Sequence, residues 1–373
     1  MATKTPQSRR VTLRDVAQAS GFSTSSVSIV LNDAPLSRYV ARKTKEHIRK
    51  TALEMGYHPD ASARSLRRQK SDTIGVLVFD ISDPFCISLL RGIEHTLYPT
   101  TYLPILIDAD NRSDHFERYL DMLLERRVEG LVVVANWLFA EIDPLARIAN
   151  HKIPTVVVGR DLTQHSIHSV VVDNERGGYE ALQHLYRLGH RNIAILRGPA
   201  EMNDSERRWQ GIQRFAAEAG LELEPRLIAQ LLFALDPNSG FENGCELTAG
   251  FLETGLAFTA ILAFDDCTAL GAMRALWQSR RRVPDDCSVI GFDDIPLAGL
   301  CTPGLTTIRQ PMLEMGTLAT RLVLEAMAQE TMGAGSNHLL HLMPPELIER
   351  DSTRARTVRQ SKRKATFVQG MPG

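Results

Sequence analysis

The chain has 373 residues, five cysteines and a formal net charge of −1 at pH 7. The odd number of cysteines and the lack of a C-x-x-C pair exclude a disulfide framework and a cysteine zinc site, and we expect no metal and no cofactor. No apolar run approaches membrane-spanning length and the first residues carry no long apolar segment, so we expect a cytoplasmic protein.

The small net charge hides a strong separation of charge along the chain. Residues 1–72 hold 14 basic and 6 acidic side chains, and residues 354–373 hold 6 basic and no acidic ones. Residues 73–353 carry a net charge of −15. A cationic end on an acidic body orients that end toward a polyanion such as DNA.

The first predicted elements are two short helices joined by a turn. Thr12 is a suitable N-cap, and apolar residues spaced three and four positions apart predict a helix that ends near Ser20. Gly21 allows the tight turn, Ser23 is a second N-cap, and a second helix is predicted over 24–31. This pattern is typical of a helix-turn-helix unit, whose second helix enters the major groove of DNA.

A third helix is predicted over about 41–55. It is expected to close a small core with Ile48, Ala52, Leu53 and Met55. On the second helix the hydroxyl side chains are expected to face outward, where they can bind phosphates or base edges; a solvated polar face is the alternative.

Short apolar segments then alternate with amphipathic helical patterns. The predicted strands are 74–79, 105–107, 131–134, 155–158, 170–172, 193–196, 261–264 and 289–292. The helical patterns include 85–97, 115–126, 176–188 and 269–277. Buried strands alternating with helices predict parallel sheets covered on both faces, and the length favours two sheets over one.

Residues that directly follow the predicted strands are candidates for a pocket, because ligands of such sheets bind beyond the carboxyl ends of the strands. This rule selects 80–85, Arg160, the stretch after Leu196, and Asp265–Asp266.

Several motifs follow one another in a fixed order. Beside the helix-turn-helix pattern they are the 60–68 linker, Val172-Asp173-Asn174, Leu188-Gly189-His190-Arg191, Gly291-Phe292-Asp293-Asp294 and Leu305-Thr306-Thr307-Ile308-Arg309-Gln310-Pro311. With these motifs the chain resembles the lactose-repressor/purine-repressor (LacI/GalR) family of transcriptional regulators along nearly its whole length. The resemblance implies an α plus α/β fold: a three-helix helix-turn-helix headpiece with a hinge helix, then a periplasmic-binding-protein-like body of two doubly wound parallel-sheet subdomains.

The resemblance also implies how the chain is divided. We expect a headpiece over 1–58, a hinge over 59–71, a body over 72–351 and a basic disordered tail over 352–373. The amino-terminal subdomain is expected to comprise about 72–172 and 303–332, and the carboxyl-terminal one about 173–302 and 333–351, with crossovers near Asp173, Pro303 and Gly333. The tail lacks leucine heptads, so a homodimer is expected, with 85–97 and 116–124 at its interface.

In the family, a hinge leucine from each subunit enters the minor groove of the operator. By this resemblance Leu66 is the expected wedge, an ordinary linker leucine being the alternative, and Arg67 contacts the groove or a phosphate. The full set of expected DNA-binding residues is Thr12, Leu13, Ser23, Thr24, Ser25, Ser26, Ser28, Ile29, Asn32, Tyr57, Ala63, Leu66 and Arg67. Ala41 departs from the family pattern, in which a serine often caps the third helix.

The resemblance places an effector in a cleft between the two subdomains. The expected effector-binding residues are Asp83, Phe85, Arg160, Asp204, Arg208, Phe233, Leu235 and Asp266. An arginine and a carboxylate that face each other across a cleft can bind a polar small molecule, although a structural ion pair is the alternative. Met202 stands where purine-binding members carry a cation, so a sugar or sugar derivative is expected.

Together these features predict a transcriptional regulator, expected to be a repressor, that binds a pseudo-palindromic operator as a dimer and responds to a small polar effector. The alternative is a nucleoid-architectural or effector-independent DNA-binding protein. A solute-binding protein would have no use for the headpiece. An enzyme is not expected, because His165, His168, His184 and His190 show neither a nucleophile elbow nor metal-ligand spacing.

Overall fold

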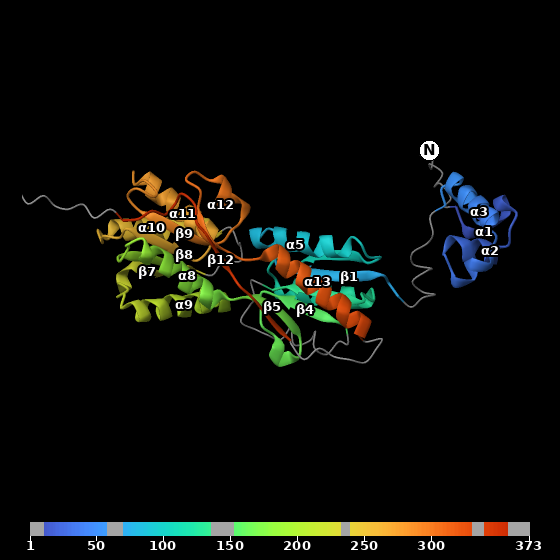
Figure 1. Ribbon diagram of the computed structural model, residues 1–373, viewed down its shortest axis with the longest axis horizontal. Coiled ribbons are helices and arrows are strands. Elements are labelled where there is room, and N and C mark those ends of the chain that lie inside the picture. Colours follow the sequence, from blue (N-terminus) through green and yellow to red (C-terminus); the bar gives the residue numbers. More distant parts are fainter. Residues whose placement is uncertain (1–10, 58–69, 136–152, 233–238, 330–338, 357–373) are drawn as a thin grey trace, which may run out of the picture. The chain divides into compact units, whose positions relative to one another are not determined.

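The computed structural model describes residues 11–57, 70–135, 153–232, 239–329 and 339–356. The chain divides into two compact units, residues 1–71 and 72–373, and Figure 1 labels many of their elements. The first unit contains α1 (Leu13–Ser20), α2 (Thr24–Leu31), the 3-10 helix η1 (Pro35–Tyr39) and α3 (Arg42–Glu54).

Local side-chain chemistry sets the boundaries of α1. Thr12 and Asp15 form a capping box, in which the Thr12 Oγ1 accepts the Asp15 N–H at 3.3 Å and the Asp15 carboxylate accepts the Thr12 N–H at 2.8 Å. The helix ends at Gly21, whose φ of 74° lies in the left-handed region that glycine adopts without strain. The predicted glycine turn is therefore present.

The core of this unit is smaller than expected. Its buried apolar residues are Val16, Ala17, Val27, Val30, Ile48 and Ala52, with Met55 packed against them. Leu53, which we expected in this core, is 82% exposed. Ile48 and Ala52 are four residues apart and share one face of α3, whereas Leu53 is rotated about 100° from Ala52 and leaves that face.

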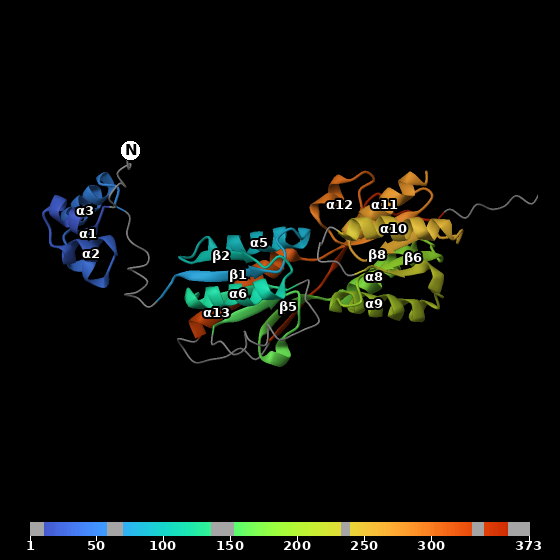
Figure 2. The same cartoon turned by 180° about the vertical axis from the view of Figure 1, so that it is seen from behind.

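The first sheet of the body has the strand order β11-β5-β4-β3-β1-β2, and every neighbouring pair is parallel. Its strands are β1 (Thr73–Val78), β2 (Leu103–Asp108), β3 (Gly130–Val134), β4 (Thr155–Val158), β5 (His168–Val172) and β11 (Leu340–Met343). Helices α5 (Pro84–Leu97) and α13 (Met312–Gln329) pack on one face and α6 (Ser113–Glu125) on the other, as Figures 1 and 2 show from opposite sides.

The second sheet has the order β12-β10-β9-β8-β6-β7, parallel except for the pair β10–β12. Its strands are β6 (Ile193–Arg197), β7 (Ile228–Gln230), β8 (Ala260–Ala263), β9 (Ser288–Asp293), β10 (Thr306–Arg309) and β12 (Glu346–Ile348). Helices α8 (Asn174–Arg187) and α9 (Asn203–Ala219) cover one face, and α10 (Ser239–Glu253) and α11 (Asp266–Gln278) cover the other. The short helices η2 (Thr163–His165), η3 (Pro225–Leu227) and α12 (Pro296–Leu300) lie in connections.

Two of the three expected crossovers are wrong. The chain does leave the first sheet at Asp173, after β5. However, β10 pairs with β9, so the return to the first subdomain comes after Arg309 and not near Pro303. Likewise β11 pairs with β5, so the last crossover falls between Met343 and Glu346 and not near Gly333. Both strands contain polar residues, Thr306 and Thr307 in β10 and His341 in β11, so neither gives the continuous apolar segment from which the other strands were predicted.

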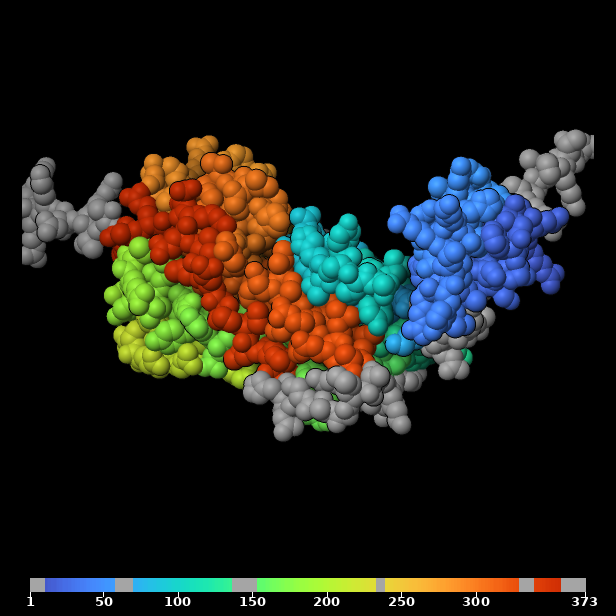
Figure 3. Space-filling model, turned by 45° about the vertical axis from the view of Figure 1, so that its right-hand side comes forward, coloured from blue at the N-terminus to red at the C-terminus, as the bar shows by residue number. Residues whose placement is uncertain are grey.

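Helices α5 and α13 approach each other closely, and Figure 3 shows them side by side in cyan and orange. A Cβ on Gly92 would collide with the backbone carbonyl of Leu313, and a Cβ on Gly316 would collide with that of Leu89. Only glycine fits at both points, and its lack of a side chain allows α13 to pack closely on α5. Helix α13 therefore belongs to the first subdomain, although it directly follows β10, a strand of the second sheet.

Candidate functional site

The polar start of α2 forms the candidate DNA-binding surface. Ser23 caps the helix: its Oγ accepts the Ser26 N–H at 3.1 Å and lies 2.9 Å from the Ser26 Oγ. Thr24 and Ser25 are exposed, and the first turn of the helix carries no acidic side chain. Hydroxyls at such a position can bind phosphate oxygens and base edges.

The remaining expected DNA contacts differ in exposure. Thr12 is exposed, whereas Ser28, Ile29 and Asn32 are half-buried on α2 and at its end. The Asn32 side-chain amide donates to the Ser28 carbonyl at 2.8 Å and to its Oγ at 3.2 Å, which fixes the end of the helix.

Leu13 and Tyr57 are half-buried and pack against the headpiece core, so most of their apolar surface has a structural role. The expected hinge contacts Ala63, Leu66 and Arg67 lie outside the described residues.

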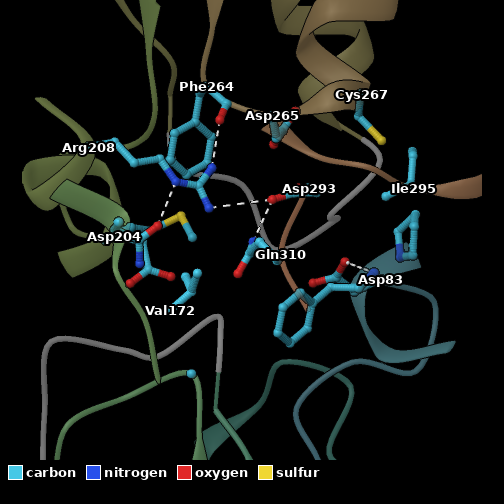
Figure 4. A pocket seen from close by; sticks show the side chains of 15 residues that line it. Asp83, Val172, Asp204, Arg208, Phe264, Asp265, Cys267, Asp293, Ile295 and Gln310 are labelled. Carbon is cyan, nitrogen blue, oxygen red and sulfur yellow. Dashed lines mark hydrogen bonds and ion pairs between the residues drawn. The ribbon is translucent and has the colours of Figure 1, made fainter. Parts of the chain in front are cut away.

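A cavity that opens to solvent is lined by residues of both subdomains (Figure 4). The lining residues are Asp83, Pro84, Phe85, Gly159, Val172, Asn174, Met202, Asp204, Arg208, Phe264, Asp265, Cys267, Asp293, Ile295 and Gln310. Four of the expected effector-binding residues are among them: Asp83, Phe85, Asp204 and Arg208. We call this cavity the cleft.

Arg208 is buried in the wall of the cleft and its guanidinium is held by the protein itself. Nε donates to Asn174 Oδ1 at 2.8 Å, Nη1 donates to the Phe264 carbonyl at 2.6 Å, and Nη2 lies 3.4 Å from Asp293 Oδ1. The guanidinium carbon also lies 3.6 Å from the ring centroid of Phe292. Hydrogen bonds along its edge and the Phe292 ring against its face fix the orientation of this guanidinium. A group with a fixed orientation loses little conformational entropy when it binds a ligand.

The packing of α9 against α8 brings Arg208 to this position. A Cβ on Gly178 would collide with the Arg208 backbone carbonyl, and a Cβ on Gly211 would collide with the Glu175 carbonyl. The two helices therefore touch backbone to backbone, and Asn174 at the start of α8 comes within reach of Arg208.

Three carboxyl groups of the second subdomain are desolvated in the cleft. Burial raises the pKa of Asp293 to about 8, with Asp265 and Asp83 acting in the same direction and Arg208 against them. Burial also raises the pKa of Asp204 to about 6, although the nearby Arg208 and Arg160 lower it. The pKa of Asp265 is raised by burial too. Part of the negative charge in the cleft is therefore suppressed near neutral pH.

The first subdomain contributes the start of α5. Asp83 is its N-cap, and Asp83 Oδ1 accepts the Phe85 N–H at 2.9 Å. This bond ties the backbone of Phe85, which is buried and also lines the cleft, to the Asp83 carboxyl that Figure 4 shows.

Asp266 and Arg160 do not line the cleft. The Asp266 side chain is fully buried, and its oxygens accept hydrogen bonds from the Thr307 hydroxyl at 2.5 Å and the Ile295 N–H at 2.9 Å. Its neighbour Asp265 is the aspartate that lines the cleft. Arg160 is half-buried and close enough to lower the pKa of Asp204. Phe233 and Leu235 lie outside the described residues.

Asn174, Asp293 and Gln310 were not predicted from the sequence as effector-binding residues. Asp293 ends β9 and Asn174 follows β5, so the rule that pockets form at the carboxyl ends of strands could have found both. The Gln310 amide follows β10, which was not predicted as a strand, and donates to Asp293 Oδ1 at 2.6 Å.

In the part of the chain that the structure describes, no cluster of three or more His, Cys, Asp or Glu side chains could hold a metal ion. None of the described helices is long and apolar enough to cross a membrane.

Comparisons with known proteins agree with this architecture. Residues 12–60 match the model of bacterial regulatory proteins of the lacI family, and residues 182–353 match the periplasmic binding protein-like domain. The transcriptional repressor CytR of Escherichia coli K12 is 32% identical over 349 residues, which are 94% of this chain and 98% of CytR.

Solved structures give the same result. The Lac repressor dimer bound to operator and the anti-inducer ONPF matches with a TM-score of 0.80 and 26% identity, over 93% of this chain and all of that chain. A LacI-family regulator from Enterococcus faecium with bound ribose matches with a TM-score of 0.64 and 28% identity, over 76% of this chain and all of that chain.

A helix-turn-helix unit followed by two parallel-sheet subdomains that share a polar cleft defines a transcriptional regulator with a ligand-binding body. The chain belongs to the lacI family of bacterial regulatory proteins. The predicted family and fold class are thereby confirmed.

Proposed function

We propose that this protein is a repressor that binds a pseudo-palindromic operator as a homodimer and is controlled by a small polar effector in the cleft. The observation that carries the proposal is the cleft itself, lined by Asp83 and Phe85 of one subdomain and by Arg208 and Asp293 of the other. A protein that only packages DNA has no need of such a site, and this argues against the nucleoid-architectural alternative.

In this proposal the exposed residues at the start of α2 contact the bases of the operator. A single headpiece reads few base pairs, so two headpieces related by a twofold axis are needed for specificity, and a palindromic operator follows. Ala63, Leu66 and Arg67 remain the proposed minor-groove segment. A protein with this role works at the nucleoid in the cytoplasm.

Effector control follows from the position of the cleft. A ligand that contacts both α5 and α9 binds best at one relative arrangement of the two subdomains, and it shifts the population toward that arrangement. We propose that this shift changes the spacing of the two hinges in the dimer and therefore operator affinity.

The amino-terminal subdomain carries an apolar surface suited to a dimer. Ile87 on α5 is 55% exposed, and Leu103 and Leu106 on the edge strand β2 are 65% and 45% exposed. The expected interface over 85–97 includes Ile87, and burial of such an exposed apolar side chain against a partner would stabilise a dimer. Ile87→Glu should yield monomers in light scattering and weaken operator binding, whereas Leu232→Glu, at a more exposed leucine of the other subdomain, should leave a dimer.

The experiment that tests the proposal is selection of bound duplexes from a random DNA pool by the purified full-length protein. A recovered palindrome supports it, and its absence under all effector conditions contradicts sequence-specific regulation. Ser25→Ala should then weaken binding to the selected duplex by about 1 kcal/mol or more while binding to a scrambled duplex stays the same. Equal losses on both duplexes would exclude Ser25 from base reading.

A further inference from the structure

The charge of the cleft is strongly unbalanced. Among the residues that the structure describes, its lining contains the carboxyl groups of Asp83, Asp204, Asp265 and Asp293 but a single cationic side chain, Arg208. Figure 4 shows Asp83 on one side of the cavity, Asp204 on the other and Asp293 between them. Arg160 lies near Asp204 but outside the lining, so acidic groups remain in excess even when it is counted.

Arg208 does not neutralise this excess. Its guanidinium is already shared among Asn174, the Phe264 carbonyl and Asp293, and its nearest carboxylate contact is the 3.4 Å contact with Asp293. Among the described residues, the Asp204 carboxylate accepts no hydrogen bond and forms no ion pair within 4 Å. The Asp204 side chain is only partly buried and lines the cleft, so its carboxylate is accessible to a cationic ligand.

The direction of the pKa shifts agrees with this arrangement. Asp204, Asp265 and Asp293 all have a raised pKa, with burial as the first cause in each case. A raised pKa means that a carboxyl group keeps its proton to a higher pH, and Asp293, with a pKa of about 8, is the group that holds its proton near neutral pH. A cation placed among these carboxyl groups would stabilise their ionised forms and so lower each pKa. The ionised carboxylates would in turn bind the cation.

The remaining lining identifies the kind of cation. Phe85, Val172 and Ile295 supply an apolar wall, while Asn174 and Gln310 supply amide groups. The described residues hold no cluster that could coordinate a metal ion. The cleft therefore suits a small organic cation with a carbon skeleton and further hydrogen-bonding groups.

We propose that the effector carries a protonated amine, as an amino sugar or another hydroxylated amine does, and that this amine binds between Asp204 and Asp293. This inference rests on the proposed function, since it specifies the ligand class of the same cleft. It replaces the neutral sugar expected from the sequence with a ligand of positive charge.

The test compares matched pairs of probes that differ only in an amine. Thermal shift and titration calorimetry on the full-length protein at pH 7.5 would use glucosamine with glucose, galactosamine with galactose, and putrescine with 1,4-butanediol. We expect at least one amine to bind about tenfold or more tightly than its neutral partner, because a charged hydrogen bond outweighs a neutral one by that amount. Putrescine is fully protonated at this pH, so its binding should also release protons from the carboxyl groups, visible as a dependence of the heat on the buffer.

Two variants locate the charge effect. Asp204→Asn should weaken amine binding about tenfold or more, and Glu206→Gln, which removes a carboxylate from the same helix outside the cleft, should leave amine binding unchanged. Equal binding of amine and neutral partner, binding of neutral probes alone, or no response to any amine overturns the inference. Duplex selection with the same sample separates this result from failure of the proposed function, since a recovered palindrome leaves the regulator intact.

Discussion

Asp266 and Thr307 form a hydrogen bond of 2.5 Å in the buried interior of the carboxyl-terminal subdomain. The same carboxylate accepts the Ile295 N–H at 2.9 Å. It therefore joins the start of α11 to β10 and to the connection after β9, from which Ile295 faces the cleft. Asp266 thus supports the shape of the cleft without lining it.

Asp266→Ala should destabilise the body by about 3 kcal/mol, because two buried donors lose their acceptor. The midpoint of urea unfolding of the full-length protein measures this loss. Asp285→Ala, at an exposed carboxylate of the same subdomain, is the control and should change stability by less than about 1 kcal/mol. An unchanged midpoint together with a lost effector response would instead make Asp266 a ligand-binding residue.

Stability of the ligand-free protein should fall as the pH rises from 6 to 9. Burial raises the pKa of Asp293 to about 8, above its value in the unfolded chain, so the folded state holds a proton that the unfolded state has lost. The stabilising contribution is complete below the unfolded pKa and is lost as the pH rises through the folded pKa. The groups that set this pKa are Arg208, Asp265, Gln310 and Asp83.

Thermal unfolding across this pH range measures the effect, with Asp293→Asn as the comparison. The variant cannot titrate at this position, so its melting temperature should depend less on pH than that of the original protein. Identical pH profiles for both proteins would show that Asp293 does not titrate in this range.

Gly211→Ala tests the close packing of α8 on α9, the two helices that bring Arg208 and Asn174 together. An added Cβ would collide with the Glu175 carbonyl, so the helices must separate, and we expect a loss of about 2 kcal/mol or more. Gly250→Ala is the matched control, because a Cβ there meets nothing within 4 Å and an alanine within a helix is favoured by about 1 kcal/mol. Chemical denaturation should therefore shift in opposite directions for the two variants.

The sequence predicted continuous apolar strands and amphipathic helices better than strands of mixed polarity. The apolar segment 193–196 corresponds closely to the buried strand β6, and the amphipathic pattern 176–188 corresponds closely to α8. Strands β10 and β11 are short, and their place in different sheets depends on long-range pairing that local periodicity does not encode.

The cleft was predicted in outline but not in detail. Arg208 was expected from the family resemblance and lines the cavity. Asp265 and Asp266 are adjacent at the junction of β8 and α11, where consecutive side chains point in different directions, so the sequence identified the pair but not the member that faces the ligand.

A substitution at Ala41 should increase the stability of the headpiece. It occupies the N-cap of α3 with an extended backbone, φ −56° and ψ 143°, and no side chain there accepts a hydrogen bond. A serine at this position can accept an N–H of the first turn, so Ala41→Ser should stabilise α3 by about 1 kcal/mol. Hydrogen exchange of the α3 amides in the full-length protein should slow by about fivefold. Ala41→Val, which cannot cap, should not slow exchange, and equal protection in both variants would show that capping does not limit the opening of this helix.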